Sequence, residues 1–443
     1  MIWDPAAECL SRAELERLQT ARLRATLRWC AERVPFYRKA LETAGVTPEA
    51  IGDVRDVARL PFTVKADLRD HYPVGLFAVP LPEVRRIHAS SGTKGKPTVV
   101  GYTARDLATW SECMARGLAA AGARPGDLVH NAYGYGLFTG GLGFHYGAER
   151  LGCTVIPVAS GNTLRQLRLL QDFRPSGLAC TPSFALHLGE ALRDTGIEAG
   201  ALGLRYGTFG AEPWSEGMRR EIEAHLGLTA VDFYGLSEVI GPGVAAECAE
   251  ARDGLHVNED HFLVEVVEPA TGVPLPSGRE GELVFTSLTK EALPVIRYRT
   301  GDLSALAEEP CRCGRTLARM ARIKGRTDDM LVIRGVNVYP SQIEAVLLEL
   351  PELAPHYQLI VDRAGPMARL EVQVEVAEAI LATWGGWQAD RAEVGGLRGR
   401  VAERLRAGLG LTTEVTVVAP RTVPRSEGKA VRVVEKSEPR RMP

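Results

Sequence analysis

The central part of the chain alternates short, largely apolar runs with longer segments of helical periodicity. The runs occupy residues 128–132, 153–157, 177–180, 204–209 and 230–234. Short apolar runs separated by helices are typical of buried strands in βαβ units. Such units build a parallel sheet with helices on its faces. The pattern therefore predicts an α/β fold with a mostly parallel sheet at its centre.

The segments on either side predict helices before this sheet and a second sheet after it. Residues 11–45 have apolar side chains at helical spacing, broken at Pro35 and Gly45, and residues 106–121 predict a further, closely packed helix. Three later runs are joined by short turns, which is typical of an antiparallel sheet or a small barrel. These runs cover residues 262–267, 281–286 and 295–298. A large domain of mixed sheets flanked by helices, with a small barrel-like sheet, is expected.

A polar joint at residues 325–329 separates this domain from a second, smaller one. Beyond the joint the order of elements is β-α-β-β-α-β, which predicts an α+β domain. The strands are expected at 330–333, 356–362, 369–375 and 414–418, and the helices over 340–350 and 392–408. We therefore predict two domains, residues 1–327 and residues 328–443.

The composition excludes several classes of protein. The chain has 443 residues and a formal net charge of −2, so it has no electrostatic preference for nucleic acid or for an anionic membrane. No apolar run approaches the roughly 18 residues that a membrane span requires. The first residues lack the basic and apolar parts of a signal peptide. We expect a cytoplasmic protein that acts on small molecules, with reduced cysteines.

One stretch of small residues and lysines predicts a phosphate-binding loop. It consists of Ser90, Ser91, Gly92, Thr93, Lys94, Gly95 and Lys96. Small residues let the backbone curl so that successive N–H groups point at one anion, and hydroxyls and lysines add donors and charge. The stretch is not a Walker A loop, because Pro97 stands where the metal-binding hydroxyl would be. On its own, the stretch is also compatible with a polar surface turn.

Four further stretches place carboxylates or a lysine beside small residues. Residues 209–214 and 232–238 suit a flat ligand against the backbone, and Glu238 could hold Mg²⁺ or stabilise a helix N-terminus. Asp302 is expected at a turn after a strand, where it could accept ribose hydroxyls or form an Asx turn. Lys429 lies in a Gly-containing loop that could bring one positive charge to a reacting phosphate, or simply be solvated.

Taken together and in this order, these stretches resemble the adenylate-forming superfamily and, within it, the phenylacetate–coenzyme A ligase family. Other matching stretches are residues 33–38, 60–69, 131–140, 296–302, 325–329 and 334–340. The resemblance covers nearly the whole chain. It implies the adenylate-forming enzyme fold, with a small mobile C-terminal domain that carries the catalytic lysine and turns about a hinge at Asp328.

The resemblance implies an acid–thiol ligase that forms an acyl adenylate from ATP, releases pyrophosphate and passes the acyl group to coenzyme A. Catalytic roles fall on Lys429, Glu238 and Lys96, with Mg²⁺ on Glu238. The implied ATP contacts are Ser90, Ser91, Gly92, Thr93, Lys94, Gly95, Gly210, Ala211, Glu212, Asp232, Tyr234, Gly235, Ser237, Asp302 and Arg326. A homodimer is a further implication of the resemblance.

The acid pocket is assigned to the aromatic residues Tyr133, Tyr135, Phe138 and Phe144. Phenylacetate ligases commonly have a small residue where Phe144 stands, so this ring should shorten the pocket. A benzoate-type acid with amino or hydroxy groups is therefore a hypothesis beside phenylacetate. Two alternatives stay open for the function: transfer to a carrier-protein thiol, amine or hydroxyl, and a non-catalytic nucleotide-binding protein.

Four further residues form a candidate zinc site. Cys311 and Cys313 form a tight pair, and Cys248 and His256 precede them. Four nitrogen and sulfur ligands suit a tetrahedral structural zinc ion, and some members of the family have the same set. His261 is the alternative nitrogen ligand, and two independent loops with free thiols are the alternative without a metal.

Overall fold

The structure is a computed structural model of the chain. It describes residues 1–90, 96–327, 329–333, 336–363, 368–410, 412–426, 428 and 430–436. Within these residues, no helix combines the length and the apolar character needed to cross a membrane.

A nine-stranded sheet forms the centre of the molecule, in the order β13-β14-β9-β8-β7-β6-β5-β3-β4. Its parallel strands are β3 (Leu128–Asn131), β4 (Thr154–Ile156), β5 (Gly177–Cys180), β6 (Tyr206–Gly210) and β7 (Thr229–Leu236). The antiparallel strands are β8 (Gly241–Glu247), β9 (Leu255–Val257), β14 (Arg319–Met320) and β13 (Leu306–Ala307). The predicted parallel sheet is confirmed, and its antiparallel extension was not predicted.

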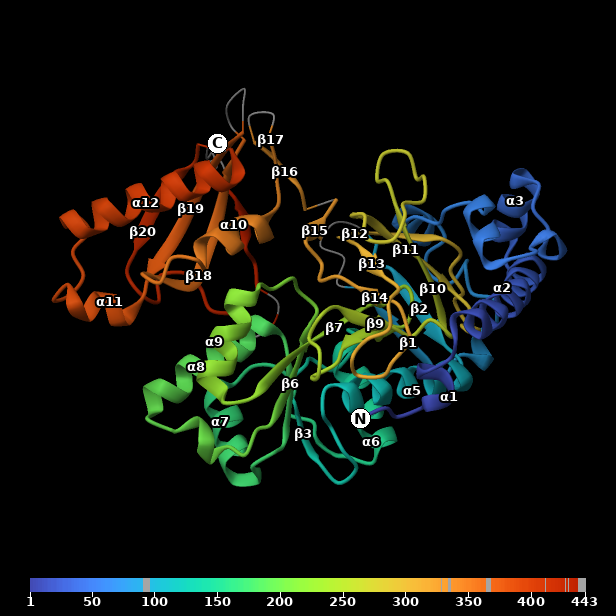
Figure 1. Cartoon of the computed structure of the whole chain (residues 1–443), viewed down its shortest axis with the longest axis horizontal. Coiled ribbons are helices and arrows are strands. Elements are labelled where there is room, and N and C mark those ends of the chain that lie inside the picture. Colours follow the sequence, from blue (N-terminus) through green and yellow to red (C-terminus); the bar gives the residue numbers. More distant parts are fainter. Residues whose placement is uncertain are drawn as a thin grey trace, which may run out of the picture.

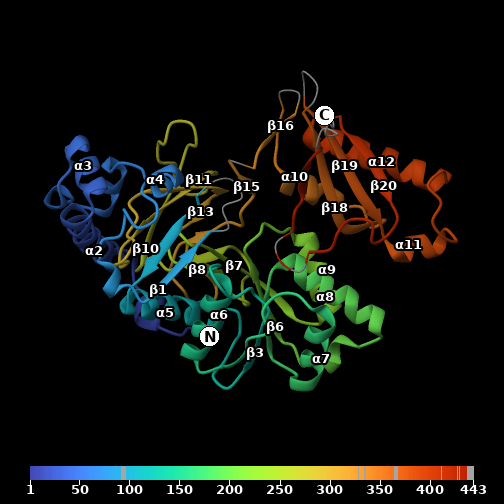
Figure 2. The same ribbon diagram turned by 180° about the vertical axis from the view of Figure 1, so that it is seen from behind.

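Helices cover both faces of the parallel strands. They are α5 (Ala104–Ala120), α6 (Gly140–Leu151), α7 (Thr163–Phe173), α8 (Pro182–Thr195) and α9 (Glu216–Leu226). Figures 1 and 2 show α7, α8 and α9 on one side of the strands and α5 and α6 on the other. Alternate strand residues enter the two cores, as when Leu178 packs with the α8 side and Ala179 with the α5 side. This is the alternation that a two-sided buried sheet requires.

A second sheet lies beside the first. Its four antiparallel strands are β10 (Phe262–Val267), β11 (Gly281–Ser287), β12 (Tyr298–Ser304) and β15 (Gly325–Arg326). One prediction was wrong here, because Asp302 lies inside strand β12, opposite Arg326, and not at a turn. The run 295–298 likewise ends where β12 begins. Pairing with the Arg326 guanidinium satisfies the Asp302 carboxylate, so this polar residue can remain in a strand.

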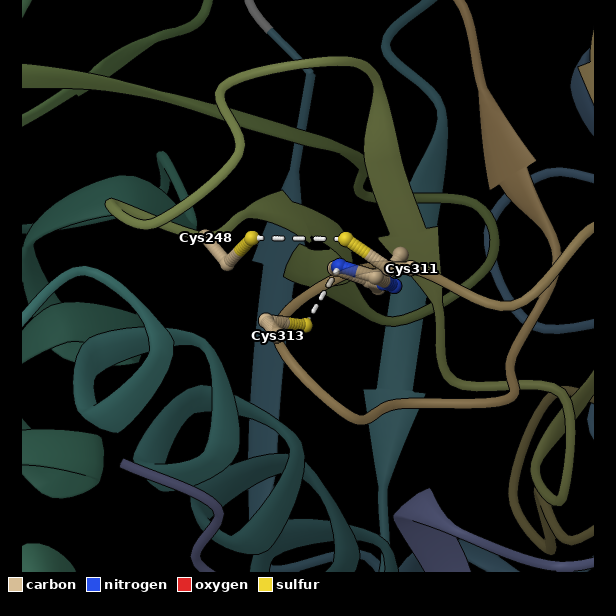
Figure 3. A group of neighbouring side chains, drawn as sticks. Cys248, Cys311 and Cys313 are labelled. Carbon is tan, nitrogen blue, oxygen red and sulfur yellow. Dashed lines mark hydrogen bonds between the residues drawn. The ribbon is translucent and has the colours of Figure 1, made fainter.

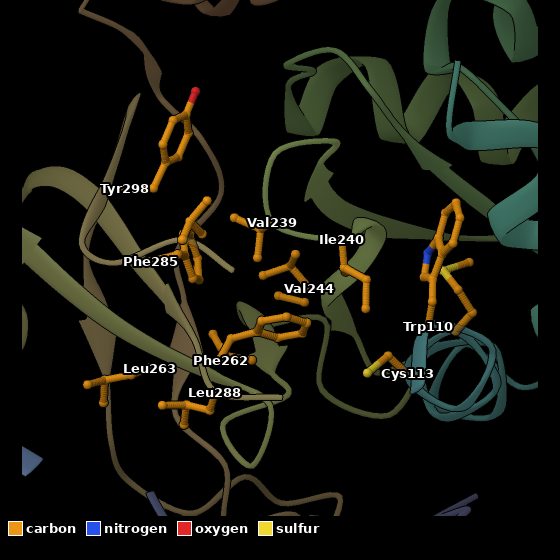
Figure 4. Close-up of a cluster of buried hydrophobic side chains, with 14 of the residues drawn as sticks. Trp110, Cys113, Val239, Ile240, Val244, Phe262, Leu263, Phe285, Leu288 and Tyr298 are labelled. Carbon is orange, nitrogen blue, oxygen red and sulfur yellow. The ribbon is translucent and has the colours of Figure 1, made fainter. Parts of the chain in front are cut away.

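One hydrophobic core joins the two sheets to helix α5 and to the N-terminal helices α2 (Arg12–Arg33) and α3 (Pro35–Ala44). Figure 4 shows Trp110 of α5, Val244 of β8 and Phe262 of β10 in this core. The hairpin of β1 (Arg86–Ala89) and β2 (Val99–Tyr102) leads into and out of the predicted phosphate loop. Short elements complete the domain: α1 (Pro5–Glu8), α4 (Lys65–Asp70), and the 3₁₀ turns η1 (Pro48–Ala50), η2 (Val54–Arg59), η3 (Leu81–Glu83) and η4 (Ala199–Ala201).

The C-terminal region has a hydrophobic core of its own. Its elements are β16 (Leu331–Ile333), β17 (Val336–Val338), α10 (Pro340–Leu347), β18 (Leu353–Asp362), β19 (Arg369–Val376), α11 (Glu378–Thr383), α12 (Ala392–Leu409), β20 (Glu414–Val418) and β21 (Val433–Glu435). The order of the main sheet is β20-β19-β18-β21. This region lies over helices α8 and α9 (Figure 1). The strands and helices predicted here are present, and β17, β21 and α11 are additional. The domain boundary after residue 327 stays a prediction.

Candidate active site

A cavity of about 250 Å³ opens beyond the carboxyl ends of β6 and β7. Ligands of open α/β sheets commonly bind at this edge. The predicted residues that line the cavity are Ser90, Tyr133, Phe138, Phe144, Gly210, Ala211, Glu212, Asp232, Tyr234, Gly235, Ser237, Glu238, Asp302 and Arg326. Stretches far apart in the sequence thus converge on one cavity.

Other predicted residues lie elsewhere. The Tyr135 hydroxyl accepts a hydrogen bond from Asn131 Nδ2 at 2.8 Å and lies 3.1 Å from His145 Nδ1, away from the cavity lining. The exposed Lys96 ammonium lies 5.6 Å from the centre of the Tyr72 ring. The predictions for Ser91, Gly92, Thr93, Lys94, Gly95, Asp328 and Lys429 fall outside the described residues.

Two glycines bring backbone segments closer together than any side chain would allow. A Cβ atom on Gly235 would lie 1.9 Å from the Gly241 carbonyl oxygen, and one on Gly210 would lie 2.1 Å from the Phe233 carbonyl oxygen. Neighbouring Ala211 has a left-handed φ of 72°. Side-chain-free backbone therefore forms part of the wall, which suits close contact with a flat ligand.

The Asp302 carboxylate lies in the cavity wall and is held from two sides. Its Oδ2 accepts a hydrogen bond from the Tyr234 hydroxyl at 2.6 Å, and its Oδ1 accepts one from Arg326 at 2.5 Å. Arg326 also donates to the Thr300 carbonyl oxygen at 3.1 Å. Burial, together with the Asp302 charge, raises the pKa of Tyr234 well above its usual value, so this phenol stays a donor. The side chain of Asp302 is thus fixed before any ligand arrives.

The Glu238 carboxylate follows β7 and is 7% exposed. Burial and then the Glu238 charge raise the pKa of nearby Tyr298. A carboxylate in this position, facing a cavity lined by Ser90 and Ser237, is a suitable oxygen ligand for Mg²⁺.

A buried charge network adjoins the cavity at Asp232 and Arg322. Arg219 donates to both oxygens of Glu247, at 2.9 and 2.7 Å, and Glu247 Oε2 accepts from the Asp232 backbone N–H at 2.9 Å. Burial and the Glu247 charge raise the pKa of Asp232 to about 7. The Arg322 guanidinium lies 4.5 Å from the Trp214 ring and also lines the cavity. Sequence reasoning missed Arg322 because no local motif surrounds it.

Aromatic rings form another part of the cavity wall. Tyr133 and Phe144 stack with their ring centres 4.8 Å apart and their planes at 11°, and Phe144 also contacts Phe233 at 5.2 Å. Both stacked rings are buried, whereas Phe138 is 45% exposed. An apolar, flat wall of this kind suits a planar hydrophobic group.

The residues on both sides of Lys429 are attached to the cavity wall of the large domain. The Gly428 carbonyl oxygen accepts hydrogen bonds from Thr181 Oγ1 at 2.8 Å and Ser183 Oγ at 3.0 Å. The Ala430 N–H donates to Glu212 Oε2 at 2.8 Å, while Glu212 Oε1 accepts from the Ser183 N–H at 2.8 Å. The described residues on either side of Lys429 are therefore docked beside Glu212, which lines the cavity.

The predicted cysteine and histidine set forms one cluster, and Figure 3 shows its three cysteines, Cys248, Cys311 and Cys313, close together. The ligand atoms of Cys248, His256, Cys311 and Cys313 all lie within 4.8 Å of one another. The Cys248 and Cys311 sulfurs are 3.9 Å apart, and Cys313 Sγ is 3.5 Å from His256 Nε2. The Cys248 thiol and then His256 lower the pKa of Cys313. His261 lies outside the cluster, beside Thr289 and Asp260.

Comparison with known proteins gives consistent matches. The model of the AMP-binding enzyme family matches residues 87–289, and that of the AMP-binding enzyme C-terminal domain matches residues 335–437. The chain is 54% identical to phenylacetate-coenzyme A ligase of Thermus thermophilus, over 98% of this chain and 99% of that one. It is 52% identical to the enzyme of the same name from Escherichia coli, over 97% and 96%.

Among solved structures, 2-hydroxyisobutyryl-CoA ligase in its postadenylation state superposes with a TM-score of 0.91 at 31% identity, covering 98% of this chain and 92% of that one. The same ligase in its thioesterification state gives a TM-score of 0.71 at 32% identity, covering 97% and 91%. Because both structures are of one protein, the difference reflects the arrangement of its parts. The present structure has the arrangement of the first.

Proposed function

Because the chain belongs to the phenylacetate–coenzyme A ligase family of AMP-binding enzymes, and is an AMP-forming acid–CoA ligase, we propose that the acid it activates is phenylacetate. Four relatives with that name are 48–54% identical to the chain over at least 97% of its length. The observation that carries the proposal is the cavity itself, whose wall contains both fixed polar groups and the stacked Tyr133 and Phe144 rings.

In the proposed first step, a carboxylate oxygen of the acid bonds to the α-phosphorus of ATP, and the bond to the bridging oxygen of pyrophosphate breaks. Asp302 accepts the ribose hydroxyls, and the backbone at Gly210 and Gly235 contacts the adenine. Glu238 would hold Mg²⁺, and the bound ion would supply positive charge beside the phosphates. Lys429, in its docked loop, stabilises the charge that develops on the transferred phosphorus group.

In the proposed second step, the thiolate sulfur of coenzyme A bonds to the acyl carbon, and AMP leaves. The contacts of Gly428 and Ala430 hold the small domain against Thr181, Ser183 and Glu212, and we propose that the small domain turns away from them before the thiol enters. We assign this movement to a hinge at Asp328. The two arrangements of 2-hydroxyisobutyryl-CoA ligase support the assignment, because they superpose on this chain to different degrees.

A benzoate-type acid is the second candidate, and Phe144 is the observation that favours it. The ring is 2% exposed and is held between Tyr133 and Phe233, so it cannot easily swing away to lengthen the pocket. An acid whose carboxylate is attached directly to the ring is shorter by one methylene than phenylacetate.

The choice between these acids gives the first prediction. We expect kcat/KM for pyrophosphate release to be at least about tenfold higher with phenylacetate than with benzoate or its amino and hydroxy derivatives, since one methylene is worth about 10- to 200-fold. The measurement is initial rates across the acid panel. The Phe144→Ala variant tests whether this ring limits the length of the pocket, and it should accept longer acids. A wild-type preference for a benzoate would overturn the assignment to phenylacetate.

We also propose a structural zinc ion at the cysteine and histidine cluster. With bonds of about 2.3 Å to sulfur and 2.0–2.1 Å to nitrogen, a tetrahedral site separates two sulfurs by about 3.8 Å and a sulfur and nitrogen by about 3.6 Å. The separations of 3.9 Å and 3.5 Å support this fit. Among the described residues that line the active-site cavity, none is a member of the cluster, so its role would be structural. The ion would join β8 and β9 to the turn at 311–314.

Metal content gives the second prediction. Purified protein should contain about one zinc ion per chain, and Cys248→Ser should contain less than about a fifth of that, with a lower melting temperature. Elemental analysis and thermal unfolding measure both. Cys153→Ser is the control, because its buried thiol donates to the Arg124 carbonyl oxygen outside the cluster and its loss should leave the zinc in place. Less than half an equivalent in the wild type would count against the site.

A further inference from the structure

One contact between helix α8 of the large domain and the small domain is made by the partly buried carboxylate of Glu190. Glu190 Oε1 accepts a hydrogen bond from His356 Nε2 of β18 at 2.5 Å, and Glu190 Oε2 accepts one from Arg425 Nε at 2.9 Å. The side chains of Glu190, His356 and Arg425 are 17%, 8% and 16% exposed. Charge-assisted bonds of this kind are strong when little water reaches them. Although burial opposes it, hydrogen bonding by the neighbouring histidines keeps the pKa of Glu190 well below its usual range.

Arg425 connects this contact to the lysine loop. Its guanidinium also donates to both oxygens of the fully buried Glu375, each at 2.9 Å, so the side chain is fixed within the small domain. Arg425 lies a few residues before Lys429 in the sequence. Gly428 and Ala430, on either side of Lys429, are hydrogen-bonded to the large domain. Glu190 therefore fixes the start of the segment that Thr181, Ser183 and Glu212 fix at its end.

A second ion pair at the same interface, between Asp194 and Arg421, is exposed to solvent and serves for comparison. Asp194 lies one helical turn beyond Glu190 and pairs with Arg421 at 2.5 Å, but the two side chains are 43% and 57% exposed. Exposed pairs of this kind are screened by water and salt and contribute little. Asp194 thus offers a matched comparison on the same helix.

We propose that Glu190 is a positioning residue for adenylation: through His356 and Arg425 it holds the small domain in the arrangement that docks the Lys429 loop. This inference rests on the two-step function proposed above. Turning the small domain away would separate Glu190 from both partners, so its contacts stabilise only the adenylation arrangement. A contact present in one of two arrangements shifts their populations by its own free energy.

The test separates the two half-reactions in the Glu190→Gln variant. Adenylation is followed as single-turnover pyrophosphate release, and thioester formation as the reaction of supplied acyl adenylate with coenzyme A. We expect adenylation to slow about tenfold, which corresponds to about 1.4 kcal/mol, while thioester formation stays within about twofold of wild type or rises. His356→Gln, which removes the same contact from the small domain, should give the same split. Thermal unfolding checks that each variant is folded.

Asp194→Asn is the control and should leave both half-reactions within about twofold of wild type. Equal slowing of both half-reactions in Glu190→Gln and His356→Gln, or no slowing of adenylation in either, would overturn the proposal. Every rate is compared with wild type using the acid that the wild type prefers in the panel. A wrong assignment of phenylacetate would therefore change the acid used but not the outcome for Glu190.

Discussion

The Lys429→Ala variant is expected to form acyl adenylate at least about a hundredfold more slowly than the wild type, which is the loss typical of one charge-stabilising group. The developing negative charge at the α-phosphorus needs a positive group, and the docked loop would supply the ammonium of this residue. The anchors at Gly428 and Ala430 hold the loop at the cavity without using the lysine side chain. ATP affinity, measured by titration calorimetry, should therefore stay within about threefold of wild type.

The control for this prediction is Lys436→Ala. Lys436 belongs to the same domain, is 63% exposed and lies 3.7 Å from Asp362, so its loss should not change adenylation. The reaction of supplied acyl adenylate with coenzyme A is a second internal control, because Lys429 acts only in the first step. A Lys429→Ala variant that adenylates at the wild-type rate would show that another group stabilises the transition state.

Local patterns predicted the parallel sheet because each of its strands is a short apolar run between helices. Strand β8 escaped prediction because it begins Gly241-Pro242-Gly243, a composition typical of a turn. The structure tolerates these residues there because Gly241 and Gly243 adopt positive φ angles and pack against Trp110 and Met114. The identity of a strand is here decided by tertiary packing, which no local pattern contains.

The cavity could be predicted from motifs because the loops that follow parallel strands meet at one edge of a sheet. The direction in which each side chain points could not be predicted from these motifs. Tyr135 is an aromatic residue in a Gly-rich segment, as expected of a pocket residue, yet its hydroxyl accepts a hydrogen bond from Asn131. Arg322 lies in no motif and still lines the cavity. The contact between Glu190 and Arg425 joins residues 235 positions apart, and neither has a sequence signal that points to the other.

Replacing Asp302 is the second change with a large expected effect, and it tests how the cavity binds the nucleotide. Asp302→Ala should raise KM for ATP by about a hundredfold or more, because two hydrogen bonds to a charged acceptor are worth about 1.5–3 kcal/mol each. The measurement is the ATP dependence of pyrophosphate release at saturating acid. KM for the acid should change little, since Asp302 contacts Tyr234 and Arg326, whereas the proposed acid pocket is formed by Tyr133 and Phe144.

The structural consequences of the same change have to be separated from the loss of ribose binding. Tyr234 and Arg326 both contact Asp302, so Asp302→Ala also removes their partner. Asp302→Asn keeps the shape of the side chain but removes its charge and one of its two acceptor oxygens, and it should raise KM for ATP by an intermediate factor. Asp329→Asn is the control, because Asp329 lies 3.8 Å from the same arginine but is 60% exposed. If Asp302→Ala and Asp302→Asn melt like the wild type and keep its KM for ATP, the ribose has to be bound elsewhere in the cavity.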